Sequence, residues 1–232
     1  MKREVPKCFL NLLINWYSRG FAFVRWNDAV SRMICMTCGV RPVCLLSPVL
    51  FAISVDDIAN SLSSSKLGCY VGGMYVGWIM HADDIILLSA SLNMLQRMLK
   101  ICETWAHYLD MKFNVAKSMV LPVGYNYAVD CAKLAIDGCE LQFVCKLKYL
   151  SVHLLCGKKL RLSLHEYKAR FFRALNGILY RVKGFSNDIV IMHLIQSYCK
   201  PLLLYACECF NMTRSEISRS CKAWRCVYWK VF

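Results

Sequence analysis

The apolar and polar positions divide the chain into a mixed first two-thirds and a helical last third. Residues 5–19 repeat apolar side chains at helical spacing, which predicts a short amphipathic helix. Residues 21–38 alternate weakly and predict two strands around an Asn27-Asp28 turn. A loop is expected over residues 39–48, and Ser47-Pro48 is a typical start for the helix that follows.

The middle of the chain predicts two hairpins and a long helix. After a flexible connector at residues 63–68, Gly72-Gly73 indicates a tight turn between two short strands. A second hairpin carries Asp83 and Asp84 between apolar β-formers. Ser91 then caps an amphipathic helix that runs to about Leu109.

The remaining segments complete a mixed fold. A short strand is expected over residues 111–121, and one or two further strands over residues 125–156. From about Leu162 onward the pattern is helical. We therefore predict an α+β fold, with an antiparallel sheet and packed helices over residues 1–160 and a basic helical region over residues 161–232.

Charge is concentrated towards the C-terminal end of the chain. Of the net charge of +14, nearly all lies after residue 140, where 16 Lys and Arg face 4 Asp and Glu. Such a concentration of cations favours a polyanionic partner, because binding releases counterions. No uncharged run reaches the roughly 18 apolar residues of a membrane span, and no signal peptide is visible. We expect no membrane segment.

The 15 cysteines form no regular disulfide framework and sit mostly among apolar residues. Cys35 and Cys38 form a CxxC pair, but no second pair supplies the other two ligands of a structural zinc site. Reduced thiols in an intracellular protein, cytoplasmic or nuclear and not secreted, are the preferred interpretation.

Asp83 and Asp84 are the most informative residues of the sequence. Paired carboxylates in a partly desolvated turn repel one another, and a divalent cation relieves that repulsion. With the small Ala82 leaving space for a strand of nucleic acid, the pair suggests phosphoryl transfer. The alternative from the local pattern alone is a solvated Asp-Asp turn.

Several separate segments then agree on one family. HADDIILLS, GVRPVCLLSPVLF and LDMKFNVAKSMVL together resemble the palm of reverse transcriptases of non-LTR (LINE-type) retrotransposons. KYLSVHL and SYCKPLLLYACE also resemble segments of that family. The resemblance implies a palm over residues 1–160, a thumb-like region after it, RNA or DNA template-primer as partner, and nucleotidyl transfer with two Mg²⁺ or Mn²⁺ ions.

The resemblance also implies roles for individual residues. Asp83 would bind the metals, with Asp84 in support, and Lys117 would lie near the incoming triphosphate. Arg41, Ser47, Pro48 and His81 would contact template or nucleotide. The charge surplus after residue 140 separately predicts nucleic-acid contacts from basic residues of the helical region, which include Lys168, Arg170 and Arg173. For Arg41 and Lys117 the alternative is a solvated cation without a contact.

The sequence also departs from the family pattern. His81 replaces an aromatic residue, Pro42-Val43 replaces Gln-Gly, and Ser151 replaces a glycine. The strand that carries the family's first catalytic aspartate is expected before Met1, and Asp56-Asp57 falls within a helix. We therefore expect an N-terminally truncated enzyme that is inactive alone and binds metal weakly.

Two other interpretations remain open. The product could be a non-enzymatic nucleic-acid binder, in which Tyr167, Phe171 and Phe172 alternate with cations; those aromatic residues could equally pack in a core. It could also be a decayed reading frame with no selected role, whose exposed strand edges would promote aggregation.

Overall fold

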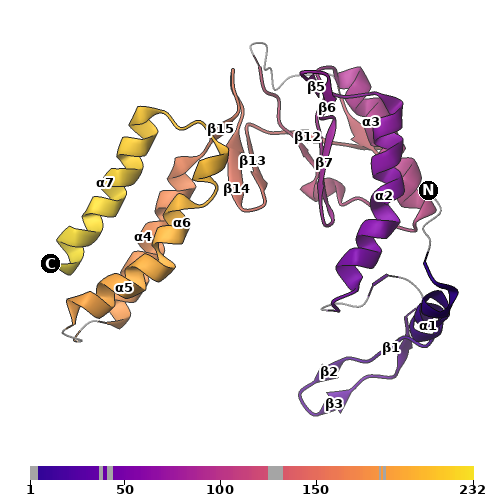
Figure 1. Ribbon diagram of the computed structural model, residues 1–232, viewed down its shortest axis with the longest axis horizontal. Helices are drawn as coiled ribbons and strands as arrows, with labels where there is room; N and C mark the ends of the chain where they lie inside the picture. The colour runs from indigo at the N-terminus through magenta and orange to yellow at the C-terminus, as the bar shows by residue number, and fades with distance from the viewer. Residues whose placement is uncertain (1–4, 37–38, 41–43, 125–132, 183, 185–186) are drawn as a thin grey trace. The chain divides into compact units, whose positions relative to one another are not determined.

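The computed structural model describes residues 5–36, 39–40, 44–124, 133–182, 184 and 187–232 (Figure 1). The chain forms two compact units, Met1–Asp110 and Met111–Phe232. Each unit combines helices with short, mostly antiparallel strands, so the predicted α+β fold class is confirmed.

The first unit begins with the predicted helix and ribbon. Helix α1 spans Lys7–Ser18 but has no buried residue, so its apolar stripe remains open to solvent. The ribbon reverses at Asn27-Asp28 as predicted, and Asn27 has a left-handed φ of 53°. Each arm of the ribbon is split into two short strands, and the pairs are β1 (Phe21–Ala22) with β4 (Ile34–Cys35) and β2 (Arg25–Trp26) with β3 (Ala29–Val30).

Two long helices provide the core of the first unit. Helix α2 spans Ser47–Ser65 and begins at the predicted Ser47-Pro48, but it continues into the segment predicted as a connector. Helix α3 spans Leu92–Tyr108 and packs against α2, where the indole N–H of Trp105 donates to the Ser61 hydroxyl at 2.8 Å. The buried side chains of this core are Ile58, Ala59, Leu62, Leu67, Met98, Leu99, Cys102 and Ala106.

The start of α3 differs from the prediction in one detail. Ser91 is the N-cap residue, yet its side chain makes no capping hydrogen bond. Instead the Ser89 hydroxyl accepts from the Ser91 N–H at 3.2 Å and donates to the Ser91 carbonyl at 2.9 Å. The serine two positions earlier therefore holds this helix start in place.

Two hairpins connect α2 to α3. Strands β5 (Tyr70–Val71) and β6 (Met74–Tyr75) turn at Gly72-Gly73, as predicted, with both glycines at positive φ. Strands β7 (Trp78–His81) and β8 (Asp84–Leu87) form the aspartate hairpin.

Close packing explains a glycine just before the first of these hairpins. A Cβ on Gly68 would lie 2.7 Å from the Cα of Gly77 and 2.9 Å from the Leu88 carbonyl oxygen. Gly68 therefore allows the strands to approach, and the neighbouring Cys69 N–H donates to that carbonyl at 3.1 Å.

The second unit starts with short elements rather than the strand predicted over residues 111–121. The Asn114 side chain accepts a hydrogen bond from the Lys117 N–H at 3.2 Å and closes a 3₁₀ turn, η1 (Val115–Lys117). Only β9 (Met119–Val120) is extended, and it pairs in parallel with β12 (Gln142–Phe143). The prediction was wrong here because a local Asx interaction competes with the strand.

A hairpin and a three-stranded sheet follow. The hairpin joins β10 (Ala135–Ile136) to β11 (Cys139–Glu140). The sheet has the order β13 (Lys146–Tyr149), β14 (Val152–Leu155) and β15 (Arg161–Leu162), all antiparallel. One or two strands were predicted over residues 125–156, whereas the described part of that range contains five, β10 to β14. Residues 125–132 lie outside the described residues.

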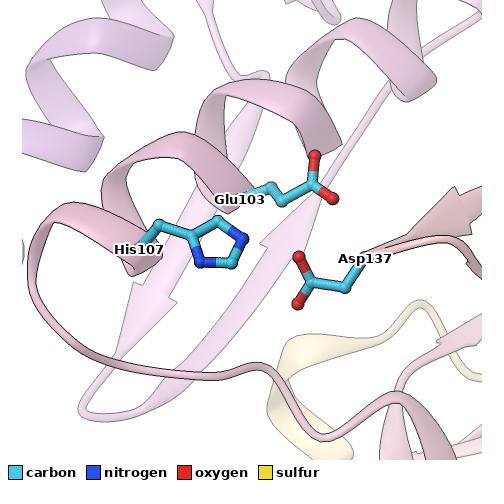
Figure 2. A group of neighbouring side chains, drawn as sticks. All are labelled: Glu103, His107 and Asp137. Atoms are coloured by element: carbon cyan, nitrogen blue, oxygen red, sulfur yellow. The ribbon is translucent and has the colours of Figure 1, made fainter.

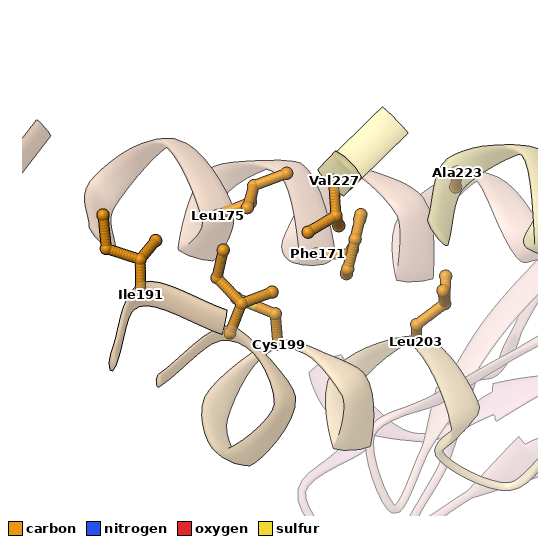
Figure 3. Close-up of a cluster of buried hydrophobic side chains, with 8 residues drawn as sticks. Phe171, Leu175, Ile191, Cys199, Leu203, Ala223 and Val227 are labelled. Atoms are coloured by element: carbon orange, nitrogen blue, oxygen red, sulfur yellow. The ribbon is translucent and has the colours of Figure 1, made fainter. Parts of the chain in front are cut away.

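The helical end of the chain is confirmed. It consists of α4 (Leu164–Arg181), α5 (Asp188–Tyr198), α6 (Lys200–Leu204), the turn η2 (Cys207–Cys209) and α7 (Arg214–Val231). Helices α4 to α7 direct side chains into one shared core (Figure 3). Its buried members are Phe171, Leu175, Ile191, Ile195, Cys199, Leu203, Ala223 and Val227.

Among the described residues, one stretch, Asp188–Cys209, is long and apolar enough to cross a membrane. The sequence pattern did not single it out. It contains α5 and α6, whose inward positions Ile191, Ile195 and Leu203 pack in the core of Figure 3. This packing accounts for the apolar residues on its inner face, whereas Ile189, Val190 and Leu204 on its outer face are exposed.

The shared helical core gives a direct test of the fold. Leu175 is fully buried, so Leu175→Ala should lower the free energy of unfolding by about 2–5 kcal/mol through lost packing. Leu204 is 50% exposed on α6, and Leu204→Ala should change it by no more than about 0.5 kcal/mol. Urea unfolding monitored by circular dichroism measures both, and equal losses would contradict the assignment of the core.

Candidate active site

The β7–β8 hairpin places the two aspartates at its tip. His81 pairs with Asp84, so Ala82 and Asp83 form a two-residue turn. Ala82 has a φ of 53°, a left-handed conformation that shapes such a turn. Because Ala has only a Cβ, it adopts this conformation at less steric cost than a branched residue would.

The surroundings of the tip are open to solvent. His81, Ala82, Asp83 and Asp84 are all exposed, whereas Ile85 and the two residues after it on β8 are half-buried. At the other end of the hairpin, the Trp78 indole N–H donates to the Ser63 hydroxyl of α2 at 3.1 Å. The base of the hairpin is thus anchored to α2, and its tip presents adjacent carboxylates to water.

The predicted nucleotide-contacting element is the start of α2. Ser47 is buried and its N–H donates to the Cys44 carbonyl at 3.1 Å, whereas Pro48 is exposed in the first turn. Arg41, predicted for the same element, lies outside the described residues. Asp56 and Asp57 are exposed within α2, as the sequence indicated.

The other predicted cations belong to the second unit. Lys117 is exposed at the end of η1, and Arg173 is exposed on α4. Lys168 is half-buried on the same helix. Arg170 is also half-buried, and its Nη1 donates to the Ser151 carbonyl at 3.3 Å. The structure thus gathers His81, Asp83 and Asp84 on one hairpin of the first unit.

Arg170 belongs to a contact that sequence reasoning missed. The β13–β14 turn consists of Leu150 and Ser151, both left-handed, with φ of 43° and 67°. The Tyr205 hydroxyl donates to the Leu150 carbonyl at 3.0 Å, while Arg170 binds the next carbonyl. Two helical-region donors therefore hold a turn that contains no glycine.

An ion pair joins the same sheet to α4. The Lys146 ammonium lies 2.5 Å from a Glu166 carboxylate oxygen, and this hydrogen bond and charge lower the pKa of Glu166. His153 lies on the neighbouring strand, where desolvation and then the charge of Lys146 lower its pKa. Neutral His153 is therefore favoured beside the basic residues of this sheet.

Other possible metal ligands are less informative. On α3, buried Glu103 and exposed His107 lie one turn apart (Figure 2). Lys100 forms an ion pair with Glu103. Asp137, also labelled in Figure 2, belongs to the β10–β11 turn of the second unit, so no metal site is assigned to the three residues. Of the CxxC pair, Cys35 is exposed on β4 and Cys38 lies outside the described residues.

The donors at the hairpin tip suit a divalent metal in kind but not in number. Carboxylate oxygens are ligands that Mg²⁺ and Mn²⁺ prefer. Over the part of the chain that the structure describes, however, Asp83 and Asp84 belong to no cluster of three potential ligands. Two exposed carboxylates leave most of the coordination sphere to water, so this pair alone does not form a complete two-metal site.

Comparison with known families identifies the class of protein. The family model described as reverse transcriptase (RNA-dependent DNA polymerase) matches residues 3–154, which is more than half of the chain. The chain therefore belongs to the reverse transcriptase family. The match includes the aspartate hairpin, the start of α2 and the β13–β14 turn.

The left-handed turn at Ser151 gives a test of local strain. Ser151→Gly should raise the free energy of unfolding by about 0.5–1 kcal/mol, because glycine adopts positive φ without a Cβ clash. Ser197 is exposed within α5, where the same change should lower stability by about 0.5 kcal/mol. Urea unfolding of both variants measures the two changes in the free energy of unfolding. A loss of stability in Ser151→Gly would contradict the inferred backbone strain at Ser151.

Proposed function

We propose that the chain carries the Asp83-Asp84 half of a non-LTR-type reverse transcriptase active site and is inactive, or nearly so, as a polymerase by itself. The observation that supports this proposal is the exposed aspartate pair at the tip of β7–β8, inside the segment matched to the family. Template-primer made of RNA or DNA is the proposed partner.

The proposed roles follow the residues present. Asp83 in the turn would be a metal ligand, and Asp84 would support it from the first position of β8. Ser47 and Pro48 would position template or nucleotide at the start of α2, together with Arg41. His81 would contact nucleic acid beside the pair, and Lys117 would neutralise a triphosphate.

The incomplete ligand set is the reason for proposing low activity. Catalysis of in-line displacement by two metals needs ligands that fix both ions. Two neighbouring exposed carboxylates provide too few protein ligands for tight binding of Mg²⁺ or Mn²⁺. A further carboxylate from another segment or another chain would have to complete the site.

The compartment is part of the same proposal. Every cysteine among the described residues is a free thiol, many of them exposed. Free thiols are typical of reducing compartments, so we place the protein in the cytoplasm or nucleus.

Primer extension tests the proposed inactivity. The full chain, supplied with an RNA template, a DNA primer and either Mg²⁺ or Mn²⁺, should extend primer no faster than Asp83→Asn. Asp28→Asn is the matched control, because Asp28 is also an exposed aspartate in a two-residue turn. Template-dependent synthesis that is lost in Asp83→Asn and retained in Asp28→Asn would show that this chain has a working site.

A second candidate function, nucleic-acid binding by the helical region, has its own support. One face of α7 exposes Lys222, Arg225 and Trp229 at helical spacing, and Trp229 is 88% exposed. The opposite face buries Ala223 and Val227 in the core (Figure 3). Cations that neutralise phosphates and an aromatic ring free to stack on a base are the features of a single-strand binding surface.

The structure changes which aromatic residues could take part. Tyr167 and Phe171 are buried, so the aromatic residues that alternate with cations on α4 pack in the core. Phe172 is half-buried, and the Lys230 Nζ lies 5.9 Å from the centroid of its ring. Exposed Trp229 replaces them as the stacking candidate, and Arg173 remains available on α4.

Binding to single-stranded RNA tests this surface. Trp229→Ala should weaken binding about 5- to 150-fold through lost stacking. Arg225→Ala should weaken it and reduce the slope of log affinity against log salt by about one. Arg97→Ala, an exposed cation on α3, is the control and should change neither. Fluorescence anisotropy measures all three, and an unchanged slope in Arg225→Ala would argue against the surface.

A further inference from the structure

Two cysteines face each other where the β13–β14 hairpin opens. The last pair of the hairpin ladder is Lys146 with Leu155, so the next positions, Cys145 and Cys156, are directly opposite. The Cys156 N–H donates to the Cys145 carbonyl at 2.9 Å, which extends the antiparallel pairing by one step.

The spacing of such a pair is compatible with a disulfide. Directly opposed antiparallel residues have Cα atoms about 5.5 Å apart at a hydrogen-bonded position. That separation lies within the range of about 4.4–6.8 Å found for disulfides. Opposed Cβ atoms are about 4.5–5.5 Å apart, with non-hydrogen-bonded pairs the closer ones, so the Cβ atoms of this hydrogen-bonded pair lie beyond the upper limit of about 4.5 Å for a relaxed bridge. A bond here would form with some strain and would be readily reduced.

Access to the two thiols differs. Cys145 is exposed, whereas Cys156 is half-buried. An external reagent therefore reaches Cys145 first, and Cys156 is placed to resolve the product.

We propose that Cys145 and Cys156 are a reversible modification site, which a low-molecular-weight disulfide such as oxidised glutathione converts to an intramolecular disulfide. This inference is independent of the polymerase and nucleic-acid functions. It assigns a role to residues at the base of the hairpin whose turn Arg170 and Tyr205 hold.

The chemistry balances with the oxidant named. The Cys145 thiolate attacks one sulfur of oxidised glutathione, forming a mixed disulfide and releasing one glutathione thiolate. Cys156 then loses its proton to solvent, and its thiolate attacks the Cys145 sulfur and expels the second glutathione. The two cysteines lose two protons and two electrons, and the oxidant is reduced to two thiols.

The environment of Cys156 favours this order of events. Desolvation raises the pKa of Cys156, and the hydrogen bond and charge of Cys145 raise it further, while a backbone hydrogen bond opposes them. Cys156 is therefore held as a thiol while Cys145 is free.

The disulfide would close the hairpin at its open end. At the turn, Arg170 and Tyr205 already bind the carbonyls of Ser151 and Leu150. The bridge would therefore enclose β13 and β14 between two fixed ends and suppress local opening of the strands. Reduction would release that constraint.

Differential alkylation with peptide mapping tests the proposal. The folded full chain at low concentration is treated with oxidised glutathione, free thiols are alkylated, and mass spectrometry identifies linked peptides. The peptide joining Cys145 to Cys156 should form about tenfold faster than any other intramolecular link, because facing thiols have a high effective concentration. Cys221 and Cys226 are the internal control, being exposed on α7 without facing each other across a strand pair.

Variants distinguish the steps. Cys156→Ser should accumulate the mixed disulfide at Cys145, and Cys145→Ser should leave Cys156 largely unmodified. Circular dichroism checks that both variants fold, and hydrogen exchange of the oxidised wild type should show slower exchange over residues 146–155. Separate mixed disulfides on both cysteines of the wild type, or linkage no faster than for Cys221 and Cys226, would overturn the proposal.

Discussion

Two-residue turns determine what this protein can present on its surface. The hairpins reverse through left-handed residues, which include Ala82 in β7–β8 and the Leu150-Ser151 pair in β13–β14. Since side chains alternate along a strand, a shift of one residue would move every side chain to the opposite face. The first turn therefore brings Asp83 to the tip with Asp84 opposite His81. The second aligns Cys145 with Cys156, five positions before and after the turn.

The sequence predicted those parts of the fold that are set by local chemistry. Gly72-Gly73 and the apolar residues around Asp83 fixed two hairpins, and Ser47-Pro48 fixed a helix start, because turn and cap preferences act within a few residues. These preferences did not predict the structure of segments in which a polar side chain hydrogen-bonds to the nearby backbone. Asn114 closes a 3₁₀ turn where a strand was expected, and Ser91 makes no capping hydrogen bond, because its backbone N–H and carbonyl bond the Ser89 hydroxyl.

In the candidate site, too, features formed by neighbouring residues could be predicted, and contacts between residues far apart in the sequence could not. The aspartate hairpin could be predicted because its motif is continuous in sequence. The clamp on Leu150 and Ser151 could not, because its donors Arg170 and Tyr205 are 19 and 55 positions away from the carbonyls they bind. The alternation of aromatic and basic residues along α4 also did not predict which face of this helix is buried. Packing against α5 to α7 placed Phe171 in the core and left Trp229 of α7 exposed.

Exposure of the hairpin tip to solvent also limits the electrostatic repulsion between the two aspartates. Two like charges about 4 Å apart repel by only about 1 kcal/mol in water, but by several times more in a desolvated site. Asp83 and Asp84 are exposed, so the hairpin needs no cation to fold; Trp78, bound to Ser63, anchors its base instead. Folding of this hairpin therefore does not depend on metal binding. A further carboxylate near the tip would add to this repulsion, and the added cost would be larger the more the completed site is desolvated.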